Sequence, residues 1–380
     1  MGKPTIRFEG YTDDWEQRKF SDVVDIGNGM DYKHLEEGNI PVYGTGGYML
    51  SVNKALSDDK DAIGIGRKGT IDKPYILRAP FWTVDTLFYC IPKENYDLDF
   101  TSCIFQNVDW KKKDESTGVP SLSKVIINNV ETAIPTFDEQ KKIGNYFRSL
   151  DYLITLHHRK CEETKKLKKF MLQKMFPKKG EKVPDIRFDG FTDDWEQRKL
   201  SEISDVRDGT HDSPSYLSDG HPFVTSKNVK DGYINYDDVQ YISDEDFEAI
   251  NKRSKVDMND ILMGMIGTIG NLALIRTEPD FAIKNVALIK DTKQVSYMYL
   301  YHYLQSSSAE RQLLSGLDGG TQKFVSLKNI RELNIMVPSE AEQLKVGNFI
   351  ESLDHLITLH QHKCEELQNI KKFMLQNMFT

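Results

Sequence analysis

The segment PTIRFEGYTDDWEQRKF at residues 4–20 returns as PDIRFDGFTDDWEQRKL at residues 184–200, with 13 of 17 positions identical. A second stretch, PTFDEQKKIGNYFRSLDYLITLHHRKCEETKKLKKFMLQKMF at residues 135–176, has a close copy at residues 338–379. The first pair is offset by 180 positions and the second by 203, so the two copies enclose segments of different length. A solenoid repeat would have a period of roughly 20–50 residues. The pattern therefore indicates tandem duplication of a whole domain together with its connector.

The repeated connector has the pattern of a helix, because its inward positions recur at alternating steps of four and three residues. Each helix would hold about 38 residues and extend ~57 Å, too long for one small domain to cover. We therefore expect the two helices to pair as a two-helix coiled coil. In the first copy the positions are Ile143, Phe147, Leu150, Ile154, His157, Cys161, Thr164, Lys168, Met171 and Met175, and the second copy has the same steps from Val346 to Met378.

The enclosed segments have a strand bias, and residues 79–91 and 281–289 have the pattern of buried strands. They are distantly related, because residues 63–78 and 261–276 share G-x-x-G-T-I followed by aliphatic residues and an arginine. We predict an α+β fold with pseudo-twofold organisation, in which two globular strand-rich domains are separated by the two long helices. The expected segments are 1–138 and 184–341 for the globular domains, 139–176 and 342–380 for the helices, and 177–183 for a linker.

Composition narrows the class of protein. The chain has 380 residues, enough for two domains, and no apolar run near the length of a membrane span or pattern of a secretory signal. We expect a cytoplasmic protein with reduced cysteines, since its four cysteines form no C-x-x-C pair. The net charge of −8 argues against extensive phosphate neutralisation, although residues 139–182 hold 13 lysines and arginines against 5 acidic residues.

The layout resembles the specificity subunit of type I restriction-modification enzymes over nearly the whole chain. The resemblance rests on the duplicated D-D-W-E-Q-R-K segment, the G-x-x-G-T-I centre, and the P-x-x-x-E-Q start of each helix. Three further segments, GTHDSP from Gly209, PFVTSKNV from Pro222 and GTQKFVSLKNI from Gly320, are similar to parts of this family's target-recognition domains. The motifs are short, so their order along the chain carries the resemblance.

The resemblance implies that each recognition domain reads one half of a bipartite DNA site, while the antiparallel helices set the gap. Divergent domains imply an asymmetric site. The implied partners are double-stranded DNA, two methyltransferase subunits and restriction/translocase subunits, with no membrane. S-adenosylmethionine would be bound by the methyltransferase, so no cofactor is expected in this chain. Its acidic charge predicts weak DNA binding in isolation.

Candidate DNA-binding residues are hydrogen-bonding, cationic or aromatic side chains near predicted turns. For each loop the alternative is a solvated or purely structural turn, and the paired glycines serve a tight turn because the Lys-Ser/Thr of a P-loop is missing. In the first domain the candidates are Tyr43, Thr45, Tyr48, Arg67, Lys68, Thr70 and Lys73. In the second they are Thr210, His211, Ser213, Ser226, Lys227, Asn228, Thr268, Lys284, Asn285, Gln322 and Lys323.

Two other repeated features have structural readings. His157 and Cys161, like His360 and Cys364, stand four residues apart, which is zinc-ligand spacing if the two pairs meet. A polar layer that sets helix register explains them without metal, and we predict none. The duplicated tryptophans Trp15 and Trp195 are expected to be buried anchors between helix and domain.

An enzymatic function is not supported by the motifs. DNA amino-methyltransferases carry an Asn/Asp-Pro-Pro-aromatic motif, and this chain has no two adjacent prolines. The P-D-x-x-x-K pattern at residues 279–284 is found in nucleases, but it lacks a convincing E-x-K partner. We therefore predict a non-catalytic specificity subunit. A coiled-coil adaptor whose two divergent domains bind proteins is the alternative.

Overall fold

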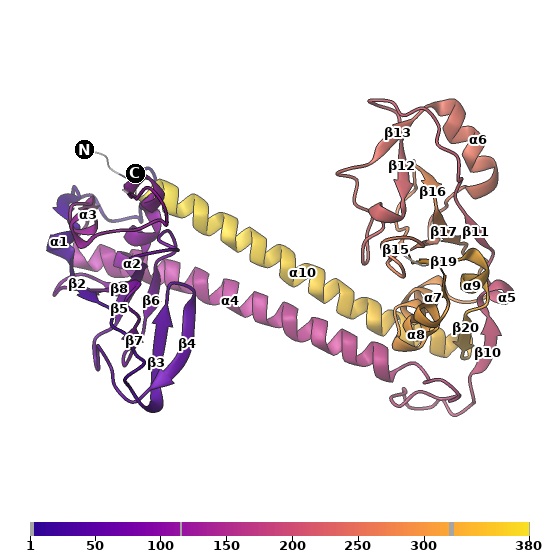
Figure 1. The fold of residues 1–380 in the computed structure, drawn as a ribbon, viewed down its shortest axis with the longest axis horizontal. Helices are drawn as coiled ribbons and strands as arrows, with labels where there is room; N and C mark the ends of the chain where they lie inside the picture. Colours follow the sequence, from indigo (N-terminus) through magenta and orange to yellow (C-terminus); the bar gives the residue numbers. More distant parts are fainter. Residues whose placement is uncertain (1–3, 115, 319–322, 380) are drawn as a thin grey trace. The chain divides into compact units, whose positions relative to one another are not determined.

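The computed structural model describes residues 4–114, 116–318 and 323–379. The chain forms two compact units, each of which combines one strand-rich region with parts of two long helices (Figure 1). Unit 1 contains the residues up to Arg159 together with those from His360 onward, and unit 2 is Lys160–Leu359. The segments predicted from the sequence treat each long helix as one piece. The compact units instead divide both helices, at residues 159/160 and 359/360.

Unit 1 is built on three small sheets. One has the strand order β2-β8-β5-β6 and is antiparallel throughout, and another has the order β4-β3-β7 with a parallel β3–β7 pair. Strands β1 and β9 form a separate ribbon. The segment expected as a strand at residues 79–91 forms two, β7 and β8. The bounds are β1 Glu16–Lys19, α1 Phe20–Val23, β2 Val24–Asn28, β3 Glu37–Gly44, β4 Gly47–Val52, β5 Ala62–Gly66, β6 Tyr75–Leu77, β7 Trp82–Thr83, β8 Leu87–Pro92, α2 Leu98–Asn107, η1 Trp110–Lys113, α3 Lys124–Asn128 and β9 Glu131–Ile134.

Unit 2 repeats this plan with the sheets β11-β17-β14-β15 and β13-β12-β16 and the ribbon β10-β20. The segment expected as a strand at residues 281–289 forms β16 and β17. The bounds are β10 Glu196–Lys199, α5 Leu200–Ile203, β11 Val206–Asp208, β12 His221–Thr225, η2 Ser226–Asn228, β13 Gln240–Ile242, α6 Asp244–Ser254, β14 Ile261–Gly264, β15 Leu272–Leu274, β16 Ala282–Lys284, β17 Val286–Ile289, α7 Tyr297–Leu304, α8 Ser307–Ser315, β18 Leu317–Asp318, β19 Phe324–Val325, α9 Leu327–Arg331 and β20 Asn334–Val337.

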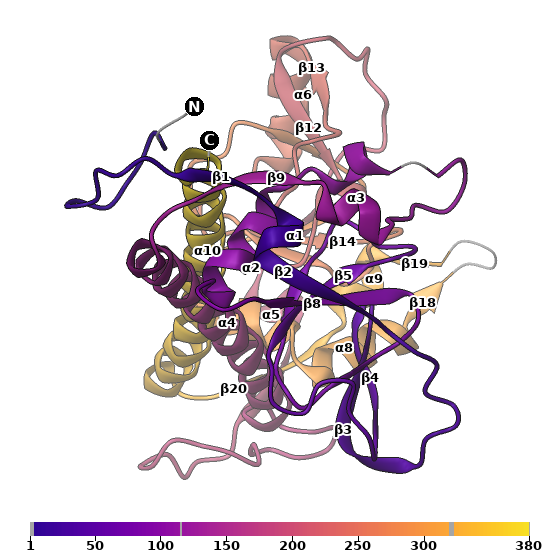
Figure 2. The same cartoon turned by 90° about the vertical axis from the view of Figure 1, so that its left-hand side faces the viewer.

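The two units have the same arrangement of core strands, and they differ in the segments that follow the equivalent strands β3 and β12. Strand β12 pairs in parallel with β16 as β3 does with β7, so the second sheet has the same topology in both units. In unit 1 β3 turns directly into β4 as a hairpin (Figure 2). In unit 2 β12 continues into η2 and a longer loop before β13, and α6 follows. The α+β class with two related strand-rich domains is confirmed.

The long helices are α4, Phe137–Lys174, and α10, Glu340–Met378. Each begins two residues before the expected start. Every inward position predicted for α4 is buried or partly buried, so the periodicity is confirmed. Among the helices of the described residues, none combines the length and the apolar character that crossing a membrane requires.

The helices pair through repeated ion pairs. Lys371 Nζ lies 2.6 Å from Asp151 Oδ1 in unit 1, and Lys168 Nζ lies 2.7 Å from Asp354 Oδ1 in unit 2. A residue early in one helix thus meets a residue late in the other in both cases, which is the antiparallel direction that the family resemblance implied. All four side chains are partly buried, so the contacts help to set the register.

The start of each long helix is tied to the beginning of its repeat by a bidentate ion pair. Arg7 Nε and Nη2 donate to the two carboxylate oxygens of Glu139 at 2.7 and 2.8 Å. Arg187 and Glu342 make the same two bonds at the same distances. Both glutamate side chains are 1% exposed. The glutamate of the repeated E-Q motif is therefore a buried anchor for the preceding segment.

The glutamine of the same motif joins the long helix to a helix of the core. Gln140 Oε1 accepts from the amide of Asp97, the residue before α2, at 3.0 Å, and its Nε2 donates to the carbonyl of Pro135. Gln343 makes the equivalent two bonds before α7 in unit 2. The glutamine thus positions one helix next to the sheet in each unit. Because the two bonds are equivalent, α2 and α7 are equivalent helices of the two units.

The tryptophan of each repeat packs at the end of a long helix. Trp195 is 2% exposed and stacks edge-to-face on Phe176, which follows α4. Trp15 is partly buried and makes the same kind of contact with Phe379, which follows α10. The expected role of buried anchor is confirmed for Trp195, and Trp15 packs in the same way at the equivalent junction while remaining partly buried. Each strand-rich region therefore packs on the far end of the helix that belongs to the other repeat.

Candidate nucleic-acid interface

The G-x-x-G-T turn that follows β5 in unit 1 and β14 in unit 2 requires both glycines. A Cβ on Gly66 would lie 2.0 Å from the carbonyl oxygen of Thr70, and one on Gly264 would lie 2.3 Å from that of Thr268. The second glycine of each turn is in the left-handed region, with φ of +95° at position 69 and +74° at position 267. The tight-turn reading of these glycines is confirmed.

In unit 1 this turn lies beside the end of the β3–β4 hairpin. The carbonyl of Thr86 accepts from the amides of Arg67 and Lys68 at 2.8 and 3.3 Å. Two residues earlier, the amide of Val84 donates to the carbonyl of Tyr43 at 3.0 Å. The connection between β7 and β8 thus joins the turn to the hairpin, and two exposed cations lie next to an aromatic segment.

In unit 2 the equivalent turn is held by Ser226 of η2. Its hydroxyl donates to the carbonyl of Asn285 and accepts from the amide of Met265, while Thr268 donates to its carbonyl. Ser226 is 5% exposed and Asn228 3%, and both amide atoms of the Asn228 side chain bond within the unit. These two candidates lie beneath the surface, and we assign them to holding the loop.

The loop after β11 is held by hydrogen bonds to the connection between β16 and β17, which also contacts Ser226. His211 Nδ1 lies 2.6 Å from Asn285 Oδ1, and its Nε2 lies 3.0 Å from Asp208 Oδ2. Lys284 Nζ donates to the hydroxyl of Ser213. Asn285 itself has a φ of +51°, a conformation that asparagine tolerates better than most residues. Side chains that were separate in sequence therefore meet around the β16–β17 connection.

The remaining candidates divide by exposure. Exposed are Tyr48, Arg67, Lys68, Lys73, His211, Ser213, Lys227 and Lys323. Partly buried are Tyr43, Thr45, Thr70, Thr210, Thr268, Lys284 and Asn285. Gln322 lies outside the described residues. Lys323 precedes β19, whose Val325 amide donates to the carbonyl of Met265 in the same turn region.

Sequence reasoning missed Met30, Asp208 and Arg253. The amides of Met30 and Thr210 donate to β7 and β16 at 2.9 and 3.1 Å, so the two residues are structural equivalents. Arg253 pairs with Asp208, the carboxylate that also contacts His211. A match between GM at residues 29–30 and GT at residues 209–210 would have suggested the first equivalence. No pattern in the sequence links Arg253 to this place.

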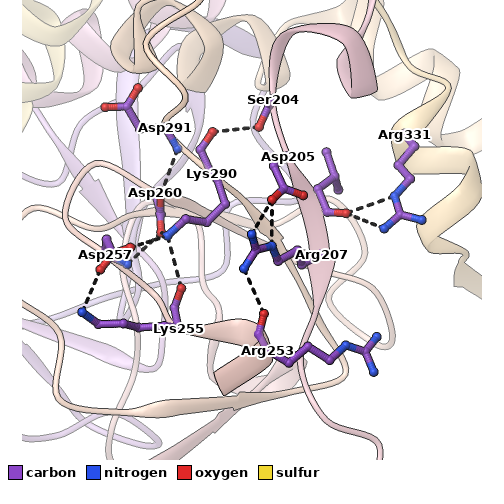
Figure 3. A network of polar contacts seen from close by, with 11 residues as sticks. Ser204, Asp205, Arg207, Arg253, Lys255, Asp257, Asp260, Lys290, Asp291 and Arg331 are labelled. Carbon is purple, nitrogen blue, oxygen red and sulfur yellow. Dashed lines mark hydrogen bonds and ion pairs between the residues drawn. The ribbon is translucent and has the colours of Figure 1, made fainter. Parts of the chain in front are cut away.

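The opposite end of the main sheet in unit 2 has a different character (Figure 3). Lys290, which follows β17, contacts Asp257 and Asp260 at 2.6 and 2.5 Å. Arg207 pairs with Asp205 at 2.6 Å. Burial opposes the charge of Lys290, but its two carboxylate partners leave its pKa raised. Lys290 and Arg207 at this end are paired with acids of the fold, whereas the turn end exposes Lys227 beside the paired His211 and Arg253. The turn end is therefore the better candidate for an anion.

The paired histidines form a polar contact between the helices. His157 Nδ1 and His360 Nδ1 are 3.0 Å apart in unit 1. Cys364 donates to the carbonyl of Ile154 in the same unit, and Cys161 donates to that of Ile357 in unit 2. In the part of the chain that the structure describes, the one group with metal-ligand geometry lies elsewhere. These contacts support the reading of a polar layer.

That group is His302, Glu351 and Asp354, within unit 2. His302 is fully buried, and its Nε2 lies 3.5 Å from a carboxylate oxygen of Glu351. Arg276 contacts Glu351 at 2.7 Å and Lys168 contacts Asp354 at 2.7 Å. Two cations therefore already balance the two carboxylates, and a divalent ion would meet repulsion. We interpret the group as a structural network around a neutral histidine.

This network predicts that unit 2 loses stability in mild acid. Burial lowers the pKa of His302 below its ordinary 6.5, and contacts with His302 and Arg276 lower the pKa of Glu351 to about 2. The unfolded state therefore binds more protons, and the unfolding free energy should fall as pH drops below about 6.5 and again below about 4.5. Urea unfolding at pH 7.5 and pH 5 measures this dependence.

A matched variant isolates the histidine. Because α2 and α7 are equivalent, Cys103 occupies in unit 1 the place of His302. His302→Cys should reduce the loss of stability between pH 7.5 and 5. An unchanged pH slope in the variant would show that other groups carry the dependence.

The matched family is described as Type I restriction modification DNA specificity domain, and its profile covers residues 12–166 and 192–369. The chain is 25% identical over 283 residues to the type I restriction enzyme MjaVIII specificity subunit of Methanocaldococcus jannaschii, covering 71% of this chain and 66% of that protein. It is 26% identical over 167 residues to the EcoBI specificity subunit of Escherichia coli, covering 42% and 35%.

Solved structures share the fold. The S subunit of a type I restriction-modification system from M. genitalium aligns with a TM-score of 0.69 at 16% identity, covering 100% of this chain and 99% of that one. A chain from a structure on complex assembly and conformational transition of the type I R-M system aligns with a TM-score of 0.54 at 14% identity, covering 97% and 98%.

The family match covers both repeats. It begins near the D-D-W-E-Q-R-K segment of each repeat and extends into each long helix. The chain spans 66% and 61% of the length of two M. jannaschii specificity subunits that it matches. Through both matched segments, this chain belongs to the family of type I restriction-modification DNA specificity domains.

Proposed function

We propose that this chain is the DNA-recognition subunit of a type I restriction-modification complex and reads a two-part site with unlike halves. The observation that carries the proposal is the pair of equivalent turn regions with different chemistry. Unit 1 presents Tyr48 with Arg67 and Lys68, whereas unit 2 presents His211 and Lys227. One framework with two such surfaces suits two different sets of base and phosphate contacts.

Chemistry is assigned to partner subunits. The chain lacks the adjacent prolines of a DNA amino-methyltransferase motif, and the buried acid–base group around His302 is occupied by its own counterions. S-adenosylmethionine would be bound by the methyltransferase. Restriction/translocase subunits would then act on unmodified DNA through the same recognition.

Exposed apolar residues on the long helices support two methyltransferase subunits. Unit 1 exposes Leu153 and Phe373, and unit 2 exposes their repeat equivalents Leu356 and Phe170. Large apolar side chains on an otherwise charged helix surface indicate a protein contact. Because the set occurs once in each unit, the same partner could bind each copy. Other subunits would also supply positive charge that this acidic chain lacks.

The test is to map DNA methylation in cells that make this chain with its methyltransferase. We expect adenine methylation at a motif with two specified halves and an unspecified gap. Exchange of residues 201–336 for those of another specificity subunit should change one half only. A continuous motif, or methylation unaffected by the exchange, would contradict the proposal.

A further inference from the structure

The tip of the β3–β4 hairpin in unit 1 is apolar and exposed. Residues 38–53 contain no charged side chain, in a chain with 28% charged residues. Near the turn, Tyr48 is 63% exposed and Met49 49%. Large apolar side chains at such a place indicate a contact surface.

The tip is held rigid from within. Tyr75 donates its hydroxyl to the carbonyl of Gly44 at 2.6 Å. The ring of Tyr43 packs edge-to-face against both Tyr75 and Tyr48, with centroids 6.2 and 6.4 Å apart. The Tyr48 hydroxyl lies 3.2 Å from that of Ser51. A side chain already fixed in this way loses little conformational entropy on binding.

One glycine of the tip has no internal explanation. Gly47 has a φ of +105°, which favours glycine for the turn. The φ of Gly46 lies outside the left-handed region, and a Cβ placed on it would meet no atom of the described residues within 4 Å. Neither the turn nor packing requires its missing side chain. A surface that approaches the backbone closely would require it.

Cations border this apolar tip. The β7–β8 connection that holds Tyr43 also holds the turn with the exposed Arg67 and Lys68. Met30, which bonds to β7 next to Tyr43, is 54% exposed. Apolar side chains flanked by cations match a DNA surface, in which bases are flanked by phosphates.

We propose that the β3–β4 tip is an uncharged wedge that contacts and partly unstacks a base step in the half-site read by unit 1, with Tyr48 as the stacking residue and Met49 beside it. The inference rests on the proposed function. Its ligand is duplex DNA, and phosphate contacts by Arg67 and Lys68 position the tip. Unit 2 has η2 with Lys227 at the equivalent place, so the wedge belongs to one half-site only.

The test uses the complex of the full chain with its methyltransferase and the specific DNA, labelled with 2-aminopurine in the half-site of unit 1. Tyr48→Phe keeps the ring and should bind like wild type. Tyr48→Ala should weaken binding about tenfold or more and lower the fluorescence that reports unstacking. Tyr48→Lys should also weaken binding, whereas tighter binding would indicate a phosphate contact and overturn the wedge.

Matched variants separate the tip from general surface effects. Met258 is 50% exposed and precedes β14, at the end of the unit 2 sheet opposite the turn. Met258→Ala should leave binding unchanged, while Met49→Ala should weaken it severalfold. Gly46→Ala should keep the melting temperature and weaken binding. Equal effects of the two methionine variants would overturn the assignment.

The failure of this inference can be told from failure of the proposed function. If the wild-type complex shows no sequence-specific binding, the proposed function fails. If it binds specifically and Tyr48→Ala binds equally well, only the wedge fails. Loss of methyltransferase assembly in Tyr48→Ala, seen by size-exclusion chromatography with light scattering, would make the tip a protein contact and also overturn the wedge.

Discussion

Arg187→Ala should destabilise unit 2 by about 3 kcal/mol, the lower end for breaking a buried ion pair. The substitution leaves the carboxylate of Glu342, 1% exposed, without its bidentate partner. It also frees the segment before β10 from the start of α10. Urea unfolding followed by circular dichroism measures the change, and Arg7→Ala should act in the same way on unit 1.

Two variants show whether the uncompensated charge is the cause. Lys199→Ala removes an exposed pair with Glu332 and should leave stability unchanged. Arg187→Ala combined with Glu342→Gln removes the charge with its partner and should recover part of the loss. No recovery in the double variant would assign the effect to lost packing of the arginine.

Gly66→Ala should be the most damaging of the small substitutions in unit 1. The added Cβ would lie 2.0 Å from the carbonyl oxygen of Thr70, a contact that only backbone movement relieves. Overpacking of this kind costs about 1–3 kcal/mol, and the movement would displace Arg67 and Lys68. We expect a lower melting temperature and loss of sequence-specific binding by the assembled complex.

The control is Gly46→Ala in the same unit. Its Cβ would meet no atom of the described residues within 4 Å, so the melting temperature should not change. Gly264→Ala, with a contact of 2.3 Å to Thr268, should reproduce the damage in unit 2. If Gly66→Ala and Gly46→Ala melted alike, the close approach at the turn would not limit stability.

The long helices and the duplication could be predicted from sequence. Their inward positions repeat over many turns, and a pattern that continues over so many residues indicates a helix even where single positions depart from it. The antiparallel direction was implied by the family resemblance, and the ion pairs between the start of one helix and the end of the other confirm it. Which residues form ion pairs, such as Asp151 with Lys371, needed the register that packing sets.

The candidate site could be predicted less well. Loop residues were selected by type, and Ser226 and Asn228 have the types that contact DNA, but both are buried. The Ser226 hydroxyl bonds to backbone atoms of Met265 and Asn285, which lie far along the chain, and the Asn228 amide bonds to Thr225 and Asn235. Met30 was missed because an exposed methionine has no polar signature.

The duplicated sequence by itself determined that one framework is used twice, because helix periodicity, turn glycines and anchoring motifs are local patterns that recur with it. Only the tertiary structure decided which side chains reach a surface together. That depends on strand pairing between segments far apart in the chain, such as β3 with β7 and β12 with β16. The sequence already indicated that the two enclosed segments differ, but which of their side chains lie at the equivalent surfaces follows from packing between distant segments.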